Sequence, residues 1–195
     1  MRQKSNNLSI IIPIFNETKT IEKFLLSLLK SFKKTNCKFI FIDDGSYDGS
    51  IEKTEKILKT NFFEENYLYK KLNKNHGKAK AVKEGINFID SDYTLLIDSD
   101  LEYSTEDAKE LYQIALKHKS IDVIQGSRYL GAKLQARKYI LNDIAVRINT
   151  LIFNFLFSQS ITDLHTGTKV IKSKLLKSLD LNYPRFGLEI NINSQ

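Results

Sequence analysis

Short runs of apolar residues recur along the first 125 positions and alternate with helical patterns. The runs of strand length are Leu8–Ile12, Lys38–Ile42, Tyr67–Leu72, Tyr93–Ile97 and Asp122–Gln125. Most of them are apolar along their whole length, which is typical of strands that are buried on both faces. The pattern therefore predicts an α/β fold with a mainly parallel sheet, because helices cover both faces of such sheets.

The segments between these runs place their apolar residues at helical spacing. Between residues 21 and 32 the apolar positions recur every three or four residues, and lysines occupy the other face. Further helices are predicted at Ile51–Leu58, Lys78–Ile89 and Ser104–Leu116. The last of these begins with acidic residues, which the helix macrodipole favours in a first turn.

The alternation weakens after Gly126. Residues 133–157 are helical or irregular and rich in Ile, Leu and Phe, whereas 168–171 and 173–179 predict one more strand and a short helix. We find no internal repeat and no linker in the sequence. We therefore expect a single domain over residues 1–195, in which residues 117–195 form an elaboration of the part built by residues 1–116.

Composition narrows the class of protein. The 195 residues are 42% hydrophobic and 27% charged, which excludes a disordered or collagen-like chain. The single cysteine, Cys37, cannot close an intramolecular disulfide, and the three scattered histidines give no zinc-finger spacing. A disulfide-stapled secreted module is therefore excluded.

The net charge of +7 comes from one half of the chain. Residues 1–116 carry 18 Lys/Arg and 18 Asp/Glu, whereas residues 117–195 carry 12 Lys/Arg against five acids. A basic half indicates an anionic partner, that is, nucleic acid, a phosphorylated substrate or an acidic membrane surface. The alternative is an ordinary solvated surface rich in lysine.

Neither a signal peptide nor a spanning helix is expected. A polar start runs directly into the first strand-like segment, without the charged and apolar regions of a signal peptide. The longest uncharged apolar stretch, residues 148–162, is interrupted by polar residues and is shorter than the roughly 18 to 20 residues that cross a bilayer.

Polar clusters follow three of the predicted strands. They are Pro13–Glu17 after the first strand, Asp43–Asp48 after the second and Asp98–Glu102 after the fourth. Ligands of open α/β sheets bind outside the carboxyl ends of the strands, so these clusters are candidate site residues. The sequence contains neither a GxGxxG nor a GxxxxGK[ST] motif, which leaves the dinucleotide and P-loop modes of phosphate binding unsupported.

Asp98 and Asp100 stand two residues apart where an apolar strand ends. Carboxylates at this spacing can face one hard cation, and Mg²⁺ or Mn²⁺ bound in this way completes its shell with water and substrate phosphates. Glu102 would add a third oxygen. The alternative is that these acids cap the helix that begins near Ser104.

The cluster after the second strand has the same ambiguity. A carboxylate of Asp43 or Asp44 can accept a hydrogen bond from a nucleobase or can cap the following helix. Phe15 can stack on a base or belong to the core.

Six ordered motifs together resemble those of a known family. They are SIIIPIFNE, FIDDGSYDGS, NHGKAKAVKEG, LLIDSDLE, VIQGSRY and TDLHTGTKV. From Leu8 to about Glu189 the chain resembles family 2 glycosyltransferases of the GT-A fold, in the branch that makes dolichyl- or polyprenyl-phosphate sugars. The GT-A fold is a Rossmann-like, mainly parallel sheet flanked by helices. Two positions depart from the family pattern, because Thr168 replaces the usual Phe and Lys169 an Arg that is common there.

The resemblance implies roles for particular residues. Nucleotide-pocket residues would be Pro13, Phe15, Glu17, Asp43 or Asp44, and Lys78. Metal ligands would be Asp98, Asp100 and Glu102, and the catalytic residues would be Asp98, Asp100 and Arg128. Acceptor-side residues would be Arg137, Asp163, Thr166 (with Gly167) and Lys169, while Arg128 and Arg137 would face phosphates. Residues 1–116 would then form the nucleotide-sugar half and residues 117–195 the acceptor half.

The implied reaction moves a hexose from a GDP- or UDP-sugar to a polyprenyl phosphate, with inversion at the anomeric carbon and with Mg²⁺ or Mn²⁺ as cofactor. A phosphate acceptor is already anionic, so alignment and electrostatic stabilisation suffice without a Ser-His-Asp constellation. The implied location is peripheral, at the cytoplasmic face of a membrane. Because relatives continue beyond Ile192, we expect a shortened enzyme or one that relies on a membrane-anchoring partner.

Three alternatives remain open at this point. A family 2 enzyme with a soluble or polysaccharide acceptor would need a general base such as Asp163. A non-catalytic relative would bind the nucleotide sugar without turnover. A nucleic-acid-binding domain has only the net charge in its favour, and we expect no nucleic-acid partner because no such motif occurs.

Overall fold

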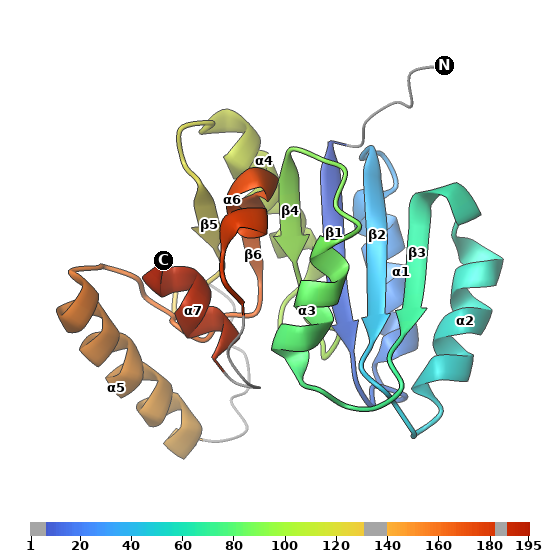
Figure 1. The fold of residues 1–195 in the computed structure, drawn as a ribbon, viewed down its shortest axis with the longest axis horizontal. Coiled ribbons are helices and arrows are strands. Elements are labelled where there is room, and N and C mark those ends of the chain that lie inside the picture. The colour runs from blue at the N-terminus through green and yellow to red at the C-terminus, as the bar shows by residue number, and fades with distance from the viewer. Residues whose placement is uncertain (1–6, 131–139, 182–186) are drawn as a thin grey trace.

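The computed structural model describes residues 7–130, 140–181 and 187–195 of the chain (Figure 1). The strands are β1 (Leu8–Ile14), β2 (Cys37–Asp43), β3 (Tyr67–Lys71), β4 (Tyr93–Leu96), β5 (Val123–Gln125) and β6 (Lys169–Lys172). The helices are α1 (Ile21–Phe32), α2 (Ser50–Asn61), α3 (Lys78–Ile86), α4 (Thr105–Lys117), α5 (Ile140–Phe157), α6 (Ser173–Ser178) and α7 (Leu188–Ser194). A short 3₁₀ helix, η1 (Glu64–Asn66), precedes β3.

The six described strands form one sheet in the order β3-β2-β1-β4-β6-β5. The pairs β1–β2, β2–β3 and β1–β4 are parallel, with Ile11 opposite Ile40 on one side and Leu96 on the other. Strand β6 runs antiparallel to both of its neighbours, β4 and β5. The expectation of a mainly parallel sheet is confirmed, and the two parts of the chain contribute strands to this same sheet.

Helices cover both faces of the sheet, as Figure 1 shows. One apolar core lies between the sheet and α1, α2 and α4, with Phe24 and Leu28 among its buried residues. A second core lies on the other face, where Val82 of α3, Leu176 of α6 and Ile192 of α7 pack on the sheet. The amphipathic pattern of residues 21–32 therefore reports burial against a sheet, and the predicted α/β architecture is confirmed.

Most predicted elements lie within a few residues of their observed bounds. The irregular or helical stretch 133–157 contains α5, although residues 131–139, and Arg137 with them, lie outside the described residues. Two elements were not predicted, η1 and α7. The seven residues of α7 place Leu188 and Ile192 in the second core, close to the end of the chain.

The alternative role of the acids after β4 as helix caps is wrong. Helix α4 is capped by Ser104, whose Oγ accepts a hydrogen bond from the Asp107 amide at 3.0 Å. Asp100 instead accepts from the backbone amide of Glu102 at 2.9 Å, within its own loop. The carboxylates of Asp98 and Asp100 are therefore not used to start α4.

Candidate active site

A cavity of about 640 Å³ opens at the carboxyl ends of β1, β2 and β4. A volume of this size is typical of small-molecule sites. The predicted site residues that line it are Pro13, Phe15, Glu17, Asp44, Lys78, Asp98 and Asp100. The lining residues that were not predicted as site residues are Ile14, Asn75, Gly77, Ser99, His165 and Glu189.

The first two loops at this edge hold each other in place. The amide of Asn16 donates to Ser46 Oγ at 3.0 Å, and Asn16 Oδ1 accepts from the amide of Tyr47 at 3.0 Å. Asn16 has a positive φ of 56°, and Leu101 in the loop after β4 has one of 66°. Left-handed backbone at residues other than glycine is uncommon and gathers at functional sites, where the surrounding contacts maintain it.

Asp44 and Asp43 play different parts. The two carboxylate oxygens of Asp44 accept from the backbone amides of His76 and Gly77, at 2.9 and 2.7 Å. Asp44 therefore lines the cavity and also fixes the loop that leads into α3. Asp43 is buried and does not line the cavity, its Oδ1 accepts from the Ser46 amide, and burial raises its pKa. Of the two predicted carboxylates, only Asp44 lines the cavity.

Lys78 joins two segments of the cavity wall. Its Nζ lies 2.7 Å from a carboxylate oxygen of Asp98 and 2.7 Å from Oε1 of Glu189. Burial acts to lower the pKa of Lys78, but the two ion pairs outweigh it and raise that pKa above its ordinary value. Lys78 therefore bridges the loop after β4 and helix α7 with a positive charge.

Gly167 packs directly against Asp98. A Cβ atom at residue 167 would lie 1.8 Å from Asp98 Oδ2 and 3.0 Å from Lys78 Nζ. Only a residue without a side chain allows this approach. Gly167 was expected to shape the acceptor side, and the structure places it against Asp98, whose side chain lines the cavity.

The carboxylate of Asp100, in the loop after β4, has a raised pKa. Desolvation by the surrounding protein, followed by the nearby charges of Asp98, Glu102 and Glu17, raises the pKa of Asp100 to about 6 although the Glu102 amide opposes this. Negative charge is thus concentrated here, which favours a bound cation. Carboxylate oxygens of Asp98 and Asp100 are the donors that Mg²⁺ and Mn²⁺ prefer, so these residues fit a divalent cation.

Glu102 does not complete a three-ligand cage in this structure. Its Oε2 lies 3.4 Å from Arg128 Nη1, and no group of three Asp, Glu, His or Cys side chains in the described ranges is placed to hold a metal ion. Mg²⁺ is commonly held by only one or two carboxylates together with substrate phosphates. Glu102 as a metal ligand stays a prediction.

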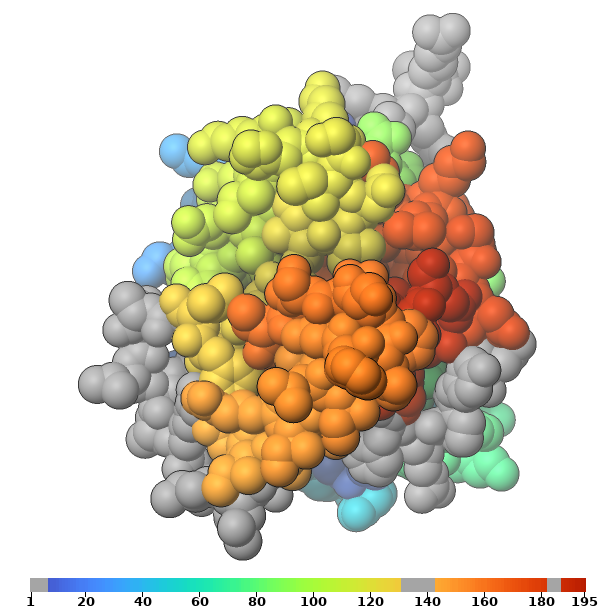
Figure 2. All heavy atoms as spheres, turned by 90° about the vertical axis from the view of Figure 1, so that its left-hand side faces the viewer, coloured from blue at the N-terminus to red at the C-terminus, as the bar shows by residue number. Residues whose placement is uncertain are grey.

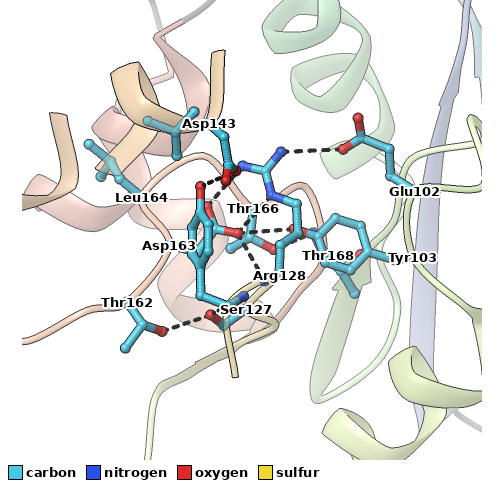
Figure 3. A network of polar contacts seen from close by, with 12 residues as sticks. Glu102, Tyr103, Ser127, Arg128, Asp143, Thr162, Asp163, Leu164, Thr166 and Thr168 are labelled. Atoms are coloured by element: carbon cyan, nitrogen blue, oxygen red, sulfur yellow. Dashed lines mark hydrogen bonds and ion pairs between the residues drawn. The ribbon is translucent and has the colours of Figure 1, made fainter. Parts of the chain in front are cut away.

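Arg128 lies between Glu102 and the buried carboxylate of Asp163, and it contacts both (Figure 3). Its Nε and Nη2 donate to the two oxygens of Asp163 at 2.8 and 2.9 Å, and its amide donates to Oδ2 at 3.1 Å. Asp163 is 0% exposed, and Tyr103 OH also donates to it at 3.3 Å. Burial acts to raise the pKa of Asp163, but the bonds from Arg128 hold that pKa below its ordinary value.

This geometry bears on two predicted roles. The guanidinium of Arg128 forms a bidentate pair with Asp163, so a contact with substrate phosphate stays a prediction. A general base must accept a proton from the acceptor. Asp163 is buried, paired and held ionised, which is the environment of a structural carboxylate and not of a base.

The remaining acceptor-side residues are not on the cavity wall. Thr166 is buried, and its Oγ1 accepts from the Thr168 amide at 3.4 Å. Lys169 is 1% exposed, and its ammonium donates to Gln125 Oε1 and Asn193 Oδ1. Burial lowers the pKa of Lys169 to about 8. The structure thus corrects the expectation that Lys169 is an acceptor-side residue, because its charged end is enclosed by protein. Arg137 lies outside the described residues.

Some of the missed lining residues carried a local signal. Gly77 and Asn75 stand in the NHGK motif beside Lys78, and His165 stands in the TDLHTGTK motif. The buried Nε2 of His165 has no hydrogen-bond partner among the described residues, so it is available to a ligand. Glu189 follows the last of the motifs, and no spacing in the sequence connects it with Lys78.

Comparisons with known proteins identify the family of the chain. A family model described as "Glycosyl transferase family 2" matches residues 9–180, so the chain belongs to glycosyl transferase family 2. The chain is 30% identical over 125 residues to undecaprenyl-phosphate 4-deoxy-4-formamido-L-arabinose transferase of Proteus mirabilis, covering 63% of this chain and 37% of that protein. It is also 30% identical over 188 residues to dolichyl-phosphate beta-glucosyltransferase of Saccharomyces cerevisiae, covering 87% of this chain and 56% of that protein.

A solved structure shares the fold. Glucosyl-3-phosphoglycerate synthase from Mycobacterium tuberculosis, in complex with Mn²⁺, uridine diphosphate and phosphoglyceric acid, aligns with a TM-score of 0.73 at 17% identity. The alignment covers 96% of this chain and 63% of that one. The expected GT-A fold is confirmed. The chain spans less than two thirds of the length of each of these three proteins.

Proposed function

We propose that this protein transfers a sugar from a nucleoside diphosphate sugar to a polyprenyl phosphate, with inversion at the anomeric carbon. The observation that carries the proposal is the cavity at the strand ends, which brings Asp98, Asp100 and Lys78 together with the loops after β1 and β2. Family membership supports sugar transfer, and two relatives are named for transfer to undecaprenyl phosphate or dolichyl phosphate.

In the proposed donor complex, Phe15 stacks on the nucleobase. Phe15 lines the cavity, and its ring meets that of Tyr47 edge to face with centroids 6.1 Å apart. Phe15 is 38% exposed and Tyr47 is 83% exposed, so this aromatic pair stands at the cavity mouth and not in the core. Aromatic faces in such positions bind bases by stacking.

The diphosphate of the donor is proposed to lie over Asp98 and Asp100. These two carboxylates would hold Mg²⁺ or Mn²⁺, which when bound neutralises the charge that develops on the departing nucleoside diphosphate. The chain itself orients the leaving group, because Asp44 braces the loop that leads into α3 through two backbone amides. Alignment and fixed charge supply much of the catalysis in such transfers.

A polyprenyl phosphate suits the acceptor side better than a hydroxyl does. A phosphate oxygen is already anionic and can attack without losing a proton, whereas a hydroxyl acceptor needs a base. Asp163, the base that the alternative requires, is tied to Arg128. The contacts of Asp163 therefore favour the anionic acceptor.

Helix α5 supplies an apolar surface for a lipid. Figure 2 shows it lying across one face of the molecule. Its exposed apolar residues are Ile144, Ile148, Leu151, Ile152, Phe155, Leu156 and Phe157. Exposed apolar surface of this kind marks a partner or a membrane interface, and Arg147 on the same helix suits anionic headgroups. In the described part of the chain, no helix has the length and apolar character needed to cross a bilayer.

Helix α5 also lies next to the proposed acceptor side. Tyr129 OH donates to Asp143 of α5 at 3.0 Å, and Arg147 stacks over the Tyr129 ring with its guanidinium carbon 4.6 Å from the centroid. Tyr129 follows Arg128 directly in the chain. We therefore propose that the protein attaches peripherally, through α5, to the cytoplasmic face of a membrane. A membrane-anchoring partner would strengthen this attachment.

A transfer assay tests the proposal. The protein is incubated with labelled UDP- or GDP-sugars, Mn²⁺ and a short polyprenyl phosphate, with the matching polyprenol and phosphoglyceric acid as control acceptors. We expect a lipid-linked sugar from the phosphate acceptor alone, and none from Asp100→Ala. Nucleotide binding without any lipid-linked product would refute the acceptor, and product from phosphoglyceric acid would favour a soluble acceptor.

A further inference from the structure

Lys78, Asp98 and Glu189 form a charge cluster that brings together three distant parts of the chain. Lys78 begins α3, Asp98 follows β4, and Glu189 stands in the first turn of α7. Both ion pairs of Lys78 measure 2.7 Å, and the side chains of Lys78, Asp98 and Glu189 are 27%, 25% and 13% exposed. Glu189 lies beyond residues 9–180, the part that matches the family model.

The position of Lys78 is unfavourable for its own helix. It is the first residue of α3, whose first turn has no acidic residue. The positive end of the helix macrodipole disfavours a cation at this position. Lys78 is therefore held there by carboxylates from outside α3, which are those of Asp98 and Glu189.

The cavity as a whole is acidic around this lysine. Among the described lining residues, five carry carboxylates and one, Lys78, carries an ammonium group. In this structure that ammonium is bound to Asp98, one of the two carboxylates that fit a divalent cation. Two cations at hydrogen-bond distance from the same carboxylate repel each other, so a metal ion bound at Asp98 weakens the Lys78 contact and favours movement of the ammonium group away from Asp98.

Asp98 has little freedom to move instead. The backbone of Gly167 packs so closely on Asp98 that a Cβ there would lie 2.7 Å from its Cγ. The lysine side chain, in contrast, has four flexible methylene groups. Glu189 already accepts from Lys78, so it can keep the ammonium group after Asp98 has released it.

We propose that Glu189 is a positioning residue that shares Lys78 with Asp98 and thereby sets the affinity of the donor cavity for its divalent cation. When the cation binds at Asp98, Glu189 retains Lys78 beside the cavity, where its charge faces the donor diphosphate. This inference rests on the proposed function, because it assumes that Asp98 binds the cation of a nucleotide-sugar site.

A double-mutant cycle read by Mn²⁺ binding tests the proposal. Free Mn²⁺ is followed by electron paramagnetic resonance for the wild type, Glu189→Gln, Lys78→Met and the double variant. In the wild-type background we expect Glu189→Gln to weaken Mn²⁺ binding about fivefold, the scale of one partly exposed ion pair, because Lys78 then stays on Asp98. In the Lys78→Met background the same change should alter binding by less than about twofold, since no lysine remains to be shared.

A matched control variant and two different negative outcomes separate the role of Glu189 from the metal site itself. Glu84→Gln removes a carboxylate of α3 that pairs with Lys70 and Lys80, and we expect it to leave Mn²⁺ binding unchanged. Circular dichroism checks each fold, and Lys78→Gln replaces Lys78→Met if the latter unfolds. If Glu189→Gln weakens Mn²⁺ binding equally in both backgrounds, or in neither, the proposed role of Glu189 is overturned. The proposed metal site is not affected by that result. A wild type that binds no Mn²⁺, with or without a nucleoside diphosphate, overturns the proposed metal site as well.

Discussion

Replacing Lys169 by methionine tests how much the buried charge of Lys169 in β6 destabilises the fold. Lys169 is 1% exposed, and its ammonium contacts the side-chain oxygens of Gln125 and Asn193. Burial lowers its pKa from 10.5 to about 8. The folded protein therefore binds this proton less tightly than the unfolded chain does.

The size and sign of the effect follow from this shift. Below pH 8 the lysine is charged in both states, and a shift from 10.5 to about 8 costs the fold about 3 kcal/mol. As the pH rises from 8 towards 10.5, the folded state releases the proton first and the cost falls. Because proton binding is linked to folding, the unfolding free energy of the wild type should rise by about 1 kcal/mol between pH 7 and pH 9. Lys169→Met should lack this rise.

Urea unfolding at pH 7 and pH 9 measures the difference directly. Other titrating groups act equally on both proteins and cancel in the comparison. Lys172→Met is the matched control, because Lys172 ends the same strand but is 33% exposed and paired with Asp122. We expect the control to follow the wild type. If the unfolding free energy of Lys169→Met rises between pH 7 and pH 9 as much as that of the wild type, burial does not destabilise the charge of Lys169 and the reasoning is wrong.

Three further changes test other parts of the structure. Gly167→Ala should displace the adjacent metal-site carboxylate and weaken Mn²⁺ binding about tenfold, the scale of 1.4 kcal/mol, in the same resonance assay. Asp163→Asn should lower the unfolding free energy by about 2 kcal/mol in urea, because it breaks the pair with the partly exposed Arg128. Leu151→Asp with Phe155→Asp should reduce co-sedimentation with anionic vesicles more than about tenfold, with an unchanged melting temperature because both side chains are exposed.

The sequence was sufficient to predict much of the architecture. Apolar runs such as Leu8–Ile12 and Lys38–Ile42 are long enough to identify buried strands, and local spacing is enough to predict amphipathic helices such as α1. The same patterns locate the strand ends, so the cavity residues Glu17, Asp44 and Asp98 could be predicted. These features depend on residues that are neighbours along the chain.

Features that depend on distant pairs could not be predicted in this way. The four residues of β6, KVIK, carry no information about the direction of the strand, which is antiparallel to its neighbours. The resemblance implies a phosphate contact for Arg128, whereas its bidentate pair with Asp163, 35 residues later, could not be inferred from the sequence. A guanidinium binds whichever carboxylate the fold places within reach.

Glu189 shows why such pairings matter for function. It is 111 residues from Lys78 in the chain, yet it contacts the same ammonium group as Asp98 does. Helix α7 is held by Leu188 and Ile192 in the second core, so burial of these apolar residues also fixes the charge of Glu189 at the cavity. We therefore expect any change that loosens α7 to release Lys78 to Asp98 alone. If Glu189 has its proposed role, Mn²⁺ binding in the cavity then depends on the packing of α7.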